Sequence, residues 1–123
     1  MAVKSYQDLL VWQKAMEYVV LCYELTKYFP KEELFGLTFQ LKKSSVSIPS
    51  NIAEGFGRLK LGEYLYFLGV AQGSLKESET QVIVAFRLKY ISVEQQAEAL
   101  AKAREVGILL GRLIDSLQRK QKD

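Results

Sequence analysis

The sequence contains no histidine and a single cysteine, Cys22, among its 123 residues. Histidine and cysteine supply the usual zinc and transition-metal ligands, and histidine is the commonest general base. Their scarcity excludes most metal sites and every histidine-based catalytic triad. A lone cysteine cannot form a disulfide within the chain, and Cys22 falls in an amphipathic stretch, which predicts a buried thiol in a reducing compartment.

Long apolar runs and proline are also scarce. No run approaches the roughly 20 apolar residues that span a bilayer, and residues 1–6 lack the features of a signal peptide. We therefore expect a cytoplasmic protein without a membrane partner. The two prolines, Pro30 and Pro49, lie in the first half of the chain, and no Gly/Ser-rich linker divides it. We therefore expect residues 1–123 to form one domain.

Hydrophobic periodicity and capping signals predict four helices. They span residues 5–28, 31–57, 62–90 and 93–119. The first and the last open with capping boxes, Ser5 with Asp8 and Ser92 with Gln95. Matched helix lengths and short connections favour an all-α fold, an antiparallel up-down-up-down four-helix bundle. Pro49 inside the second helix predicts a kink.

The first helix carries more apolar surface than a single core needs. Its two neighbouring stripes consist of Leu9, Trp12, Met16, Val19 and Tyr23, and of Val11, Ala15, Tyr18, Cys22, Leu25 and Phe29. Together they cover about 220° of the helix, against the roughly 100° that faces one core. Because such an aromatic patch usually marks an interface, we expect a homo-oligomer. The interface candidates are Trp12, Tyr18, Tyr23 and Phe29.

Polar side chains on the second and third helices predict a buried polar network. A polar stripe runs beside the core stripe of the second helix, and two glutamates fall within apolar stripes of the third. A carboxylate that faces a core must be paired or hydrogen-bonded. The predicted network consists of Gln40, Ser47, Asn51, Glu54, Glu77 and Glu79. It either fixes the register of the helices or forms a polar groove for a ligand or partner. The small residues Gly69, Gly73 and Ser74 would let another helix approach closely.

Three kinds of chemistry can be weighed against this structural interpretation. Glu54 with Glu77 or Glu79 could form an acid/base pair of the glycosidase type, but so small a bundle leaves little room for a substrate pocket. A di-metal carboxylate site normally pairs glutamate with histidine, which is missing. The glycines at 55, 57 and 62 lack the phosphate-loop pattern and fit a helix stop and turn. We expect no catalytic residue, metal or cofactor, and a protein that is not an enzyme.

Charge gives a mild basic excess. The 17 basic and 14 acidic residues leave a net charge of +3 and a pI near 8.9, which permits contact with nucleic acid without requiring it. The candidate nucleic-acid-binding residues are Lys42, Lys43, Arg58, Lys60, Arg119 and Lys120. Repeated around a ring of subunits, these side chains could form a phosphate-binding surface whose affinity falls with salt.

Most of the chain resembles a family of small bacterial four-helix bundle proteins related to the S23 proteins, which are encoded in intervening sequences of 23S rRNA genes. The resemblance is carried by the LLVWQKA run at 9–15, by Phe29-Pro30, by SIPSNIAEG at 47–55 and by Arg58. It implies a ring, typically a homopentamer, without established catalytic residues. Relatives commonly carry Arg-Arg-Ala-Ala where this chain has Lys42-Lys43-Ser44-Ser45, which keeps the charge but loses the bidentate fork of arginine.

The chain is also distantly similar to the accessory variability proteins of diversity-generating retroelements, which bind nucleic acid and a reverse transcriptase. We therefore predict a non-catalytic, homo-oligomeric scaffold. It would bind RNA or DNA, or a nucleic-acid-handling protein such as a reverse transcriptase, through its basic patches. The alternative is a protein-binding adaptor that does not bind nucleic acid and uses the wide apolar face of the first helix.

Overall fold

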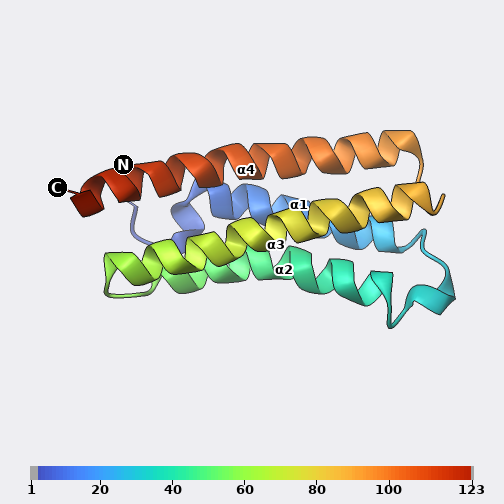
Figure 1. Ribbon diagram of the computed structural model, residues 1–123, viewed down its shortest axis with the longest axis horizontal. Helices are drawn as coiled ribbons and strands as arrows, with labels where there is room; N and C mark the ends of the chain where they lie inside the picture. Colours follow the sequence, from blue (N-terminus) through green and yellow to red (C-terminus); the bar gives the residue numbers. More distant parts are fainter. Residues whose placement is uncertain (1–2, 123) are drawn as a thin grey trace.

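The computed structural model describes residues 3–122, which form four α-helices and two short 3-10 turns, with no strand in this range. The helices are α1 (Leu10–Thr26), α2 (Leu37–Phe56), α3 (Leu61–Arg87) and α4 (Val93–Lys122), and the turns are Tyr6–Asp8 and Lys31–Glu33. Consecutive helices run in opposite directions, and each packs against its two neighbours in the order α1, α2, α3, α4 and back to α1 (Figure 1). The α2–α3 turn and the end of α4 lie at one end of the bundle, and the other two connections lie at the opposite end.

The core is built from one stripe of each helix. The second predicted stripe of α1, from Val11 to Phe29, is buried along its whole length. It meets large apolar side chains of α2 and α3, and both small and large ones of α4. These are Leu41, Ile48 and Ile52 of α2, Leu68, Leu75 and Val82 of α3, and Ala99, Ala103, Val106, Leu110 and Leu117 of α4. Within residues 3–122, no helix is both long enough and apolar enough to cross a lipid bilayer.

Both predicted capping boxes are present, but the first one opens a different element. Ser5 and Asp8 cap the 3-10 turn, and the extended backbone of Leu9 then separates this turn from α1. The helix therefore begins at Leu10, five residues later than predicted. At Ser92 the box works as expected: Gln95 donates its backbone N–H to Ser92 Oγ at 3.0 Å, and Gln95 Oε1 accepts from Ser92 N at 2.8 Å.

The predicted start of the second helix at residue 31 is wrong. Residues 31–33 make a 3-10 turn, and α2 begins at Leu37 behind Gly36. Glu33 takes the place of a conventional cap, because its Oε1 accepts from Leu37 N at 2.9 Å and its Oε2 accepts from Tyr90 OH at 2.8 Å. The backbone N–H of Leu37, followed by the Tyr90 hydroxyl, lowers the pKa of Glu33. A side chain 57 residues away thus helps to fix where α2 begins.

The third helix ends earlier, and the fourth later, than predicted. Lys89 adopts a left-handed conformation (φ 67°), while Lys89 N donates to Phe86 O and Tyr90 N to Ala85 O. This Schellman pattern stops α3 at Arg87, although glycine is the usual residue at such a position. Helix α4 continues through the basic residues to Lys122, three residues beyond the predicted end at 119. Asp123 lies outside the described residues.

Close packing of α2 on α3 depends on Gly55. A Cβ atom built on Gly55 would lie 2.9 Å from Phe67 Cβ and 3.1 Å from Tyr64 O. By contrast, Cβ atoms built on Gly69 and Gly73 would meet nothing within 4 Å. The expectation that Gly69 and Gly73 allow another helix of this chain to approach was therefore wrong. Gly55 is the glycine that allows two helices to approach closely, although the sequence suggested it only as part of a helix stop.

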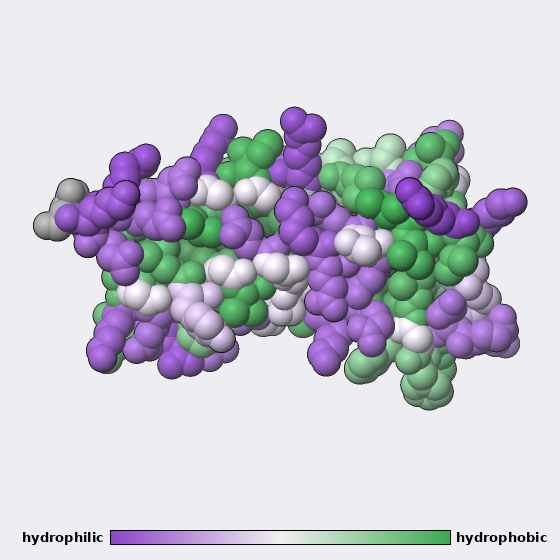
Figure 2. Space-filling model, viewed as in Figure 1, coloured by the Kyte–Doolittle hydropathy of each residue, from purple (hydrophilic) through white to green (hydrophobic). Residues whose placement is uncertain are grey.

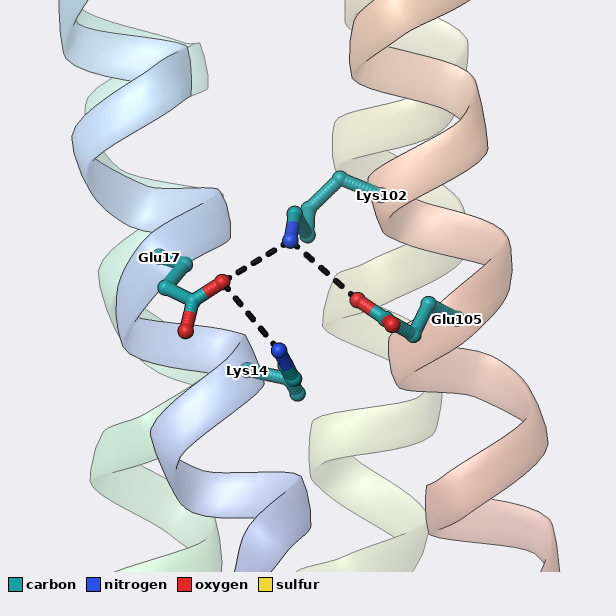
Figure 3. Close-up of polar contacts among 4 residues, drawn as sticks. All are labelled: Lys14, Glu17, Lys102 and Glu105. Carbon is teal, nitrogen blue, oxygen red and sulfur yellow. Dashed lines mark hydrogen bonds and ion pairs between the residues drawn. The ribbon is translucent and has the colours of Figure 1, made fainter.

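Charged side chains join α1 to α4 on the opposite side of the bundle (Figure 3). Lys102 Nζ lies 2.8 Å from Glu17 Oε1 and 3.2 Å from Glu105 Oε1, and Lys14 Nζ lies 3.6 Å from the same Glu17 oxygen. The hydrogen bond from Lys102 lowers the pKa of Glu17, and the bond to Glu17 raises the pKa of Lys102. These surface contacts are screened by salt, so they align the two helices more than they stabilise the fold.

The two kinds of glycine give a stability test. Gly73→Ala should raise the free energy of unfolding by about 0.5–1 kcal/mol, because alanine favours an exposed helix interior and its methyl group meets no neighbour. Gly55→Ala should lower it by about 1–3 kcal/mol, because the methyl group overpacks the α2–α3 contact. Urea denaturation of both variants measures these changes. Equal shifts in the same direction would contradict the packing described above.

Candidate functional site

Neutral side chains, and not carboxylates, form the polar contact between α2 and α3. Ser47 Oγ lies 2.8 Å from Ser74 Oγ, and Ser44 Oγ donates to Gln81 Oε1 at 2.6 Å. Asn51 Nδ2 donates to Ser47 Oγ at 2.9 Å. We call these five residues the α2–α3 polar seam. Every buried side-chain nitrogen and oxygen in residues 3–122 has a hydrogen-bond partner, so nothing in the seam is left unsatisfied for a ligand.

Four members of the predicted buried network lie elsewhere. Gln40, Glu54 and Glu77 are exposed, and Glu79 is partly exposed, with its Oε1 3.5 Å from Lys76 Nζ. Only Ser47 and Asn51, of the six predicted members, belong to the seam. The helical wheel placed the others within or next to apolar stripes, but the positions that face α3 on α2 are occupied by small hydroxyl side chains.

The carboxylates considered as an acid/base pair are far apart. Ser47 and Ser74 lie opposite one another in antiparallel helices. Glu54 lies two turns from this point in one direction, and Glu77 lies nearly one turn from it in the other, which separates them by about 15 Å along the bundle axis. Glycosidase carboxyl pairs are separated by at most about 9.5 Å. Glu54 instead accepts a hydrogen bond from Arg58 Nη2 at 2.6 Å.

Two of the four predicted interface residues lie in the core. Tyr18 is fully buried, and its hydroxyl lies 2.8 Å from Ser78 Oγ. Phe29 is buried against Tyr90, with ring centroids 5.7 Å apart. The assignment of Tyr18 and Phe29 to an oligomer interface is therefore wrong. Trp12 is partly exposed and Tyr23 is 40% exposed, so both remain accessible to a partner.

An apolar groove of about 320 Å³ lies between α1 and α2. It is lined by Tyr6, Trp12, Met16, Val19, Val46, Pro49, Ser50 and Ala53. These residues carry no charge, and Met16 remains 39% exposed. The groove is the part of the first apolar stripe of α1 that the core leaves uncovered, as the width of that stripe predicted.

A second hollow of about 350 Å³ continues this surface toward the α1–α2 connection. It is lined by Tyr23, Phe39, Lys42, Lys43 and Val46, and we call it the lysine–aromatic hollow. Lys42 Nζ lies 5.0 Å from the centroid of the Tyr23 ring. Phe39 and Val46 were not predicted as site residues, although their spacing of seven residues, continued by Ala53, places all three on one face of α2.

The predicted nucleic-acid-binding residues fall into separate groups. Lys42 and Lys43 belong to the lysine–aromatic hollow, about four helical turns from Arg58. Lys60 lies in the α2–α3 turn, at the same end of the bundle as Arg119 and Lys120, and Gln121 Nε2 approaches Gly62 there (Figure 1). Hydrophilic side chains dominate this end in Figure 2, while hydrophobic ones gather toward the opposite end.

Arg58 differs from the other predicted cations because carboxylates neutralise it. Its Nη2 lies 2.6 Å from Glu54 Oε2, and its Nη1 lies 3.6 Å from Glu63 Oε1. The guanidinium also lies 4.5 Å from the centroid of the Phe67 ring. Arg58 therefore ties the α2–α3 turn together, which weakens the prediction that it binds phosphate.

Residues 7–112 match the family described as 23S rRNA-intervening sequence protein. The chain belongs to this family. Among solved structures, it resembles a protein of unknown function from the S23 ribosomal protein family of Bacteroides thetaiotaomicron, with a TM-score of 0.80 and 26% identity over 86% of this chain and 96% of that one. No curated protein gives a significant match.

The part of the chain that matches the 23S rRNA-intervening sequence family covers α1 to α3 and most of α4. It includes the apolar groove and the lysine–aromatic hollow, whereas Arg119 and Lys120 lie beyond it. Within residues 3–122, no cluster of three or more cysteine or carboxylate side chains could hold a metal ion. Two further hollows lie between α3 and α4 (about 530 Å³) and between α1 and α4 (about 380 Å³). Their linings include Glu79 and Glu105, whereas the linings of the two hollows between α1 and α2 contain no carboxylate.

The environment of Cys22 predicts an inert thiol. Burial raises the pKa of Cys22 to about 12, so at pH 8 the folded protein holds on the order of 10³-fold less thiolate than an unfolded chain. Labelling by a thiol reagent at pH 8 should be negligible in buffer and complete in 8 M urea. Rapid labelling of the folded protein would contradict the burial of this side chain.

Proposed function

We propose that the protein is a non-catalytic, homo-oligomeric scaffold that binds RNA or DNA through basic side chains on its surface. The observation that carries this proposal is that five of the six predicted nucleic-acid-binding residues have no carboxylate to neutralise them among the described residues. Lys42, Lys43, Lys60, Arg119 and Lys120 have no carboxylate oxygen within 4.0 Å among residues 3–122. Free surface cations attract phosphates and release counterions when they bind them.

Family membership supports the same proposal. The family description refers to the 23S rRNA intervening sequence, and the solved relative is assigned to an S23 ribosomal protein family. A ring of five such chains, as the family resemblance implies, would have a charge of about +15. Symmetry would then repeat each pair of free cations several times along one bound strand.

Self-association is proposed to use the apolar groove between α1 and α2. A surface of this kind is unfavourable in water, and its lining carries no charge that would oppose a second apolar surface. A groove on one side of the chain that receives a different surface of the next copy makes a heterologous contact, and such contacts form a ring when the rotation between copies closes. Trp12, Met16 and Val19 would lie at this contact.

The same groove favours a second candidate function, that of a protein-binding adaptor. Apolar grooves between two helices commonly accept an amphipathic helix of a partner, here a reverse transcriptase or another nucleic-acid-handling protein. The two functions differ in what purified protein does alone: a scaffold self-associates and binds nucleic acid, whereas an adaptor does neither until its partner is added.

Binding to nucleic acid can be measured by fluorescence anisotropy with labelled RNA and DNA oligonucleotides. We expect the affinity to fall steeply between about 50 and 300 mM salt, because phosphate contacts release counterions. An affinity that does not change over this range, or no binding at 50 mM salt, would contradict the proposal.

Self-association can be tested with Met16→Glu, which places a charge in the apolar groove. Light scattering behind size exclusion should give a multi-subunit mass for the unaltered protein and a monomer mass for this variant, since burying an unpaired charge is costly. Gln118→Glu, which adds the same charge at an exposed site of α4, is the matched control. A monomeric unaltered protein would rule out the oligomer.

A further inference from the structure

The lysine–aromatic hollow places two exposed aromatic side chains beside two lysines. Phe39 is 51% exposed and Tyr23 40% exposed, so part of each aromatic side chain meets solvent. Lys42 and Lys43 line the same hollow. Large exposed aromatic side chains are unfavourable in water, and their position beside two ammonium groups indicates a ligand with both a flat apolar part and a negative charge.

The charges that face the hollow are all of one sign among the described residues. Its lining contains two lysines and no carboxylate, and neither lysine forms an ion pair in residues 3–122. The Lys42 ammonium lies 5.0 Å from the centroid of the Tyr23 ring, and Phe39 is the more exposed of the two aromatic side chains. Arg58 and Phe67 form a comparable pair, but Glu54 and Glu63 already neutralise the arginine.

We infer that the lysine–aromatic hollow binds an unpaired nucleotide of single-stranded nucleic acid, with the base against Phe39 and Tyr23 and the phosphate beside Lys42 and Lys43. Every base has a π-face, so such stacking does not depend on sequence, and lysine provides the point charge that a phosphate requires. A hollow of about 350 Å³ is within the size range of small-ligand sites, whereas the bases of a duplex are stacked inside the helix and cannot enter it. This inference rests on the proposed nucleic-acid binding and specifies its ligand.

The apolar groove differs from the hollow, although the two share Val46. The groove has no charged residue in its lining, so it suits an apolar surface of a second protein copy. The hollow has two unneutralised lysines, which do not suit such an apolar surface. One face of α1 and α2 thus carries both a surface for self-association and a surface for nucleic acid.

The test compares a labelled single-stranded 15-mer with a duplex of the same sequence, by anisotropy at about 50 mM salt. Phe39→Leu keeps an apolar side chain but removes the ring. It should weaken single-strand binding at least about fivefold and leave duplex binding unchanged. Phe35→Leu, the same substitution at a side chain that is 89% exposed outside the hollow, should have no effect. Lys43→Gln should reduce the slope of log K against log salt by about 0.7, a change that a structural role would not produce.

Several outcomes would overturn the inference. If single strands bind in a salt-dependent way but Phe39→Leu has no effect, the proposed function stands and the hollow is not the site. If Tyr66→Leu, at an exposed ring near the basic end of the bundle, weakens binding instead, the site is at that end. If Phe39→Leu changes the mass of the oligomer, the hollow is a contact between copies. If no oligonucleotide binds, the proposed function itself fails.

Discussion

The close approach of α2 to α3 is the constraint on which the other surfaces depend. Gly55 and the hydroxyl side chains of Ser44, Ser47 and Ser74 are small, so the backbones of the two helices can come together and their polar atoms can pair. On its other side, α2 faces bulky residues of α1, Trp12 and Met16 among them, which cannot pack as closely. The result is an asymmetric bundle in which α2 packs tightly on α3, while hollows lie between each of the other neighbouring helix pairs.

The sequence predicted the parts of this fold that depend on neighbouring residues. Four helices, both capping boxes and the wide apolar face of α1 follow from local periodicity and spacing. The start of α2 could not be predicted in this way, because Glu33 caps it with the help of Tyr90, a residue in the connection that follows α3. The end of α3 was also missed, since its left-handed position is occupied by Lys89 and not by glycine.

Several site residues were predicted wrongly because their positions also depend on contacts between helices. A helical wheel shows which residues share a face but not which neighbour that face meets. Tyr18 and Phe29 therefore looked like interface residues, whereas they contact Ser78 and Tyr90 inside the bundle. Glu54 looked like a buried carboxylate, and it pairs with Arg58 at the surface. Lys42 and Lys43 were among the candidate binding residues of the sequence. That they share a hollow with Tyr23 and Phe39 became apparent only from the packing of α1 against α2.

Different sides of the bundle carry different kinds of side-chain contact. Ion pairs occupy the α1–α4 side and a satisfied polar seam occupies the α2–α3 side. The face shared by α1 and α2 has neither, and it exposes apolar and aromatic side chains beside free lysines. We propose that this face is the binding surface of the protein and that the rest of the bundle supports its shape.

Hydroxyl-radical footprinting read by mass spectrometry reports the solvent access of individual methionine and aromatic side chains, and it can therefore detect binding at the α1–α2 face. We expect Met16 to become protected as protein concentration rises, and Tyr23 and Phe39 to become protected when a single-stranded oligonucleotide is added. Tyr66 should remain as reactive as before. Protection of Tyr66, with Met16, Tyr23 and Phe39 unchanged, would contradict the assignment of the α1–α2 face as the binding surface.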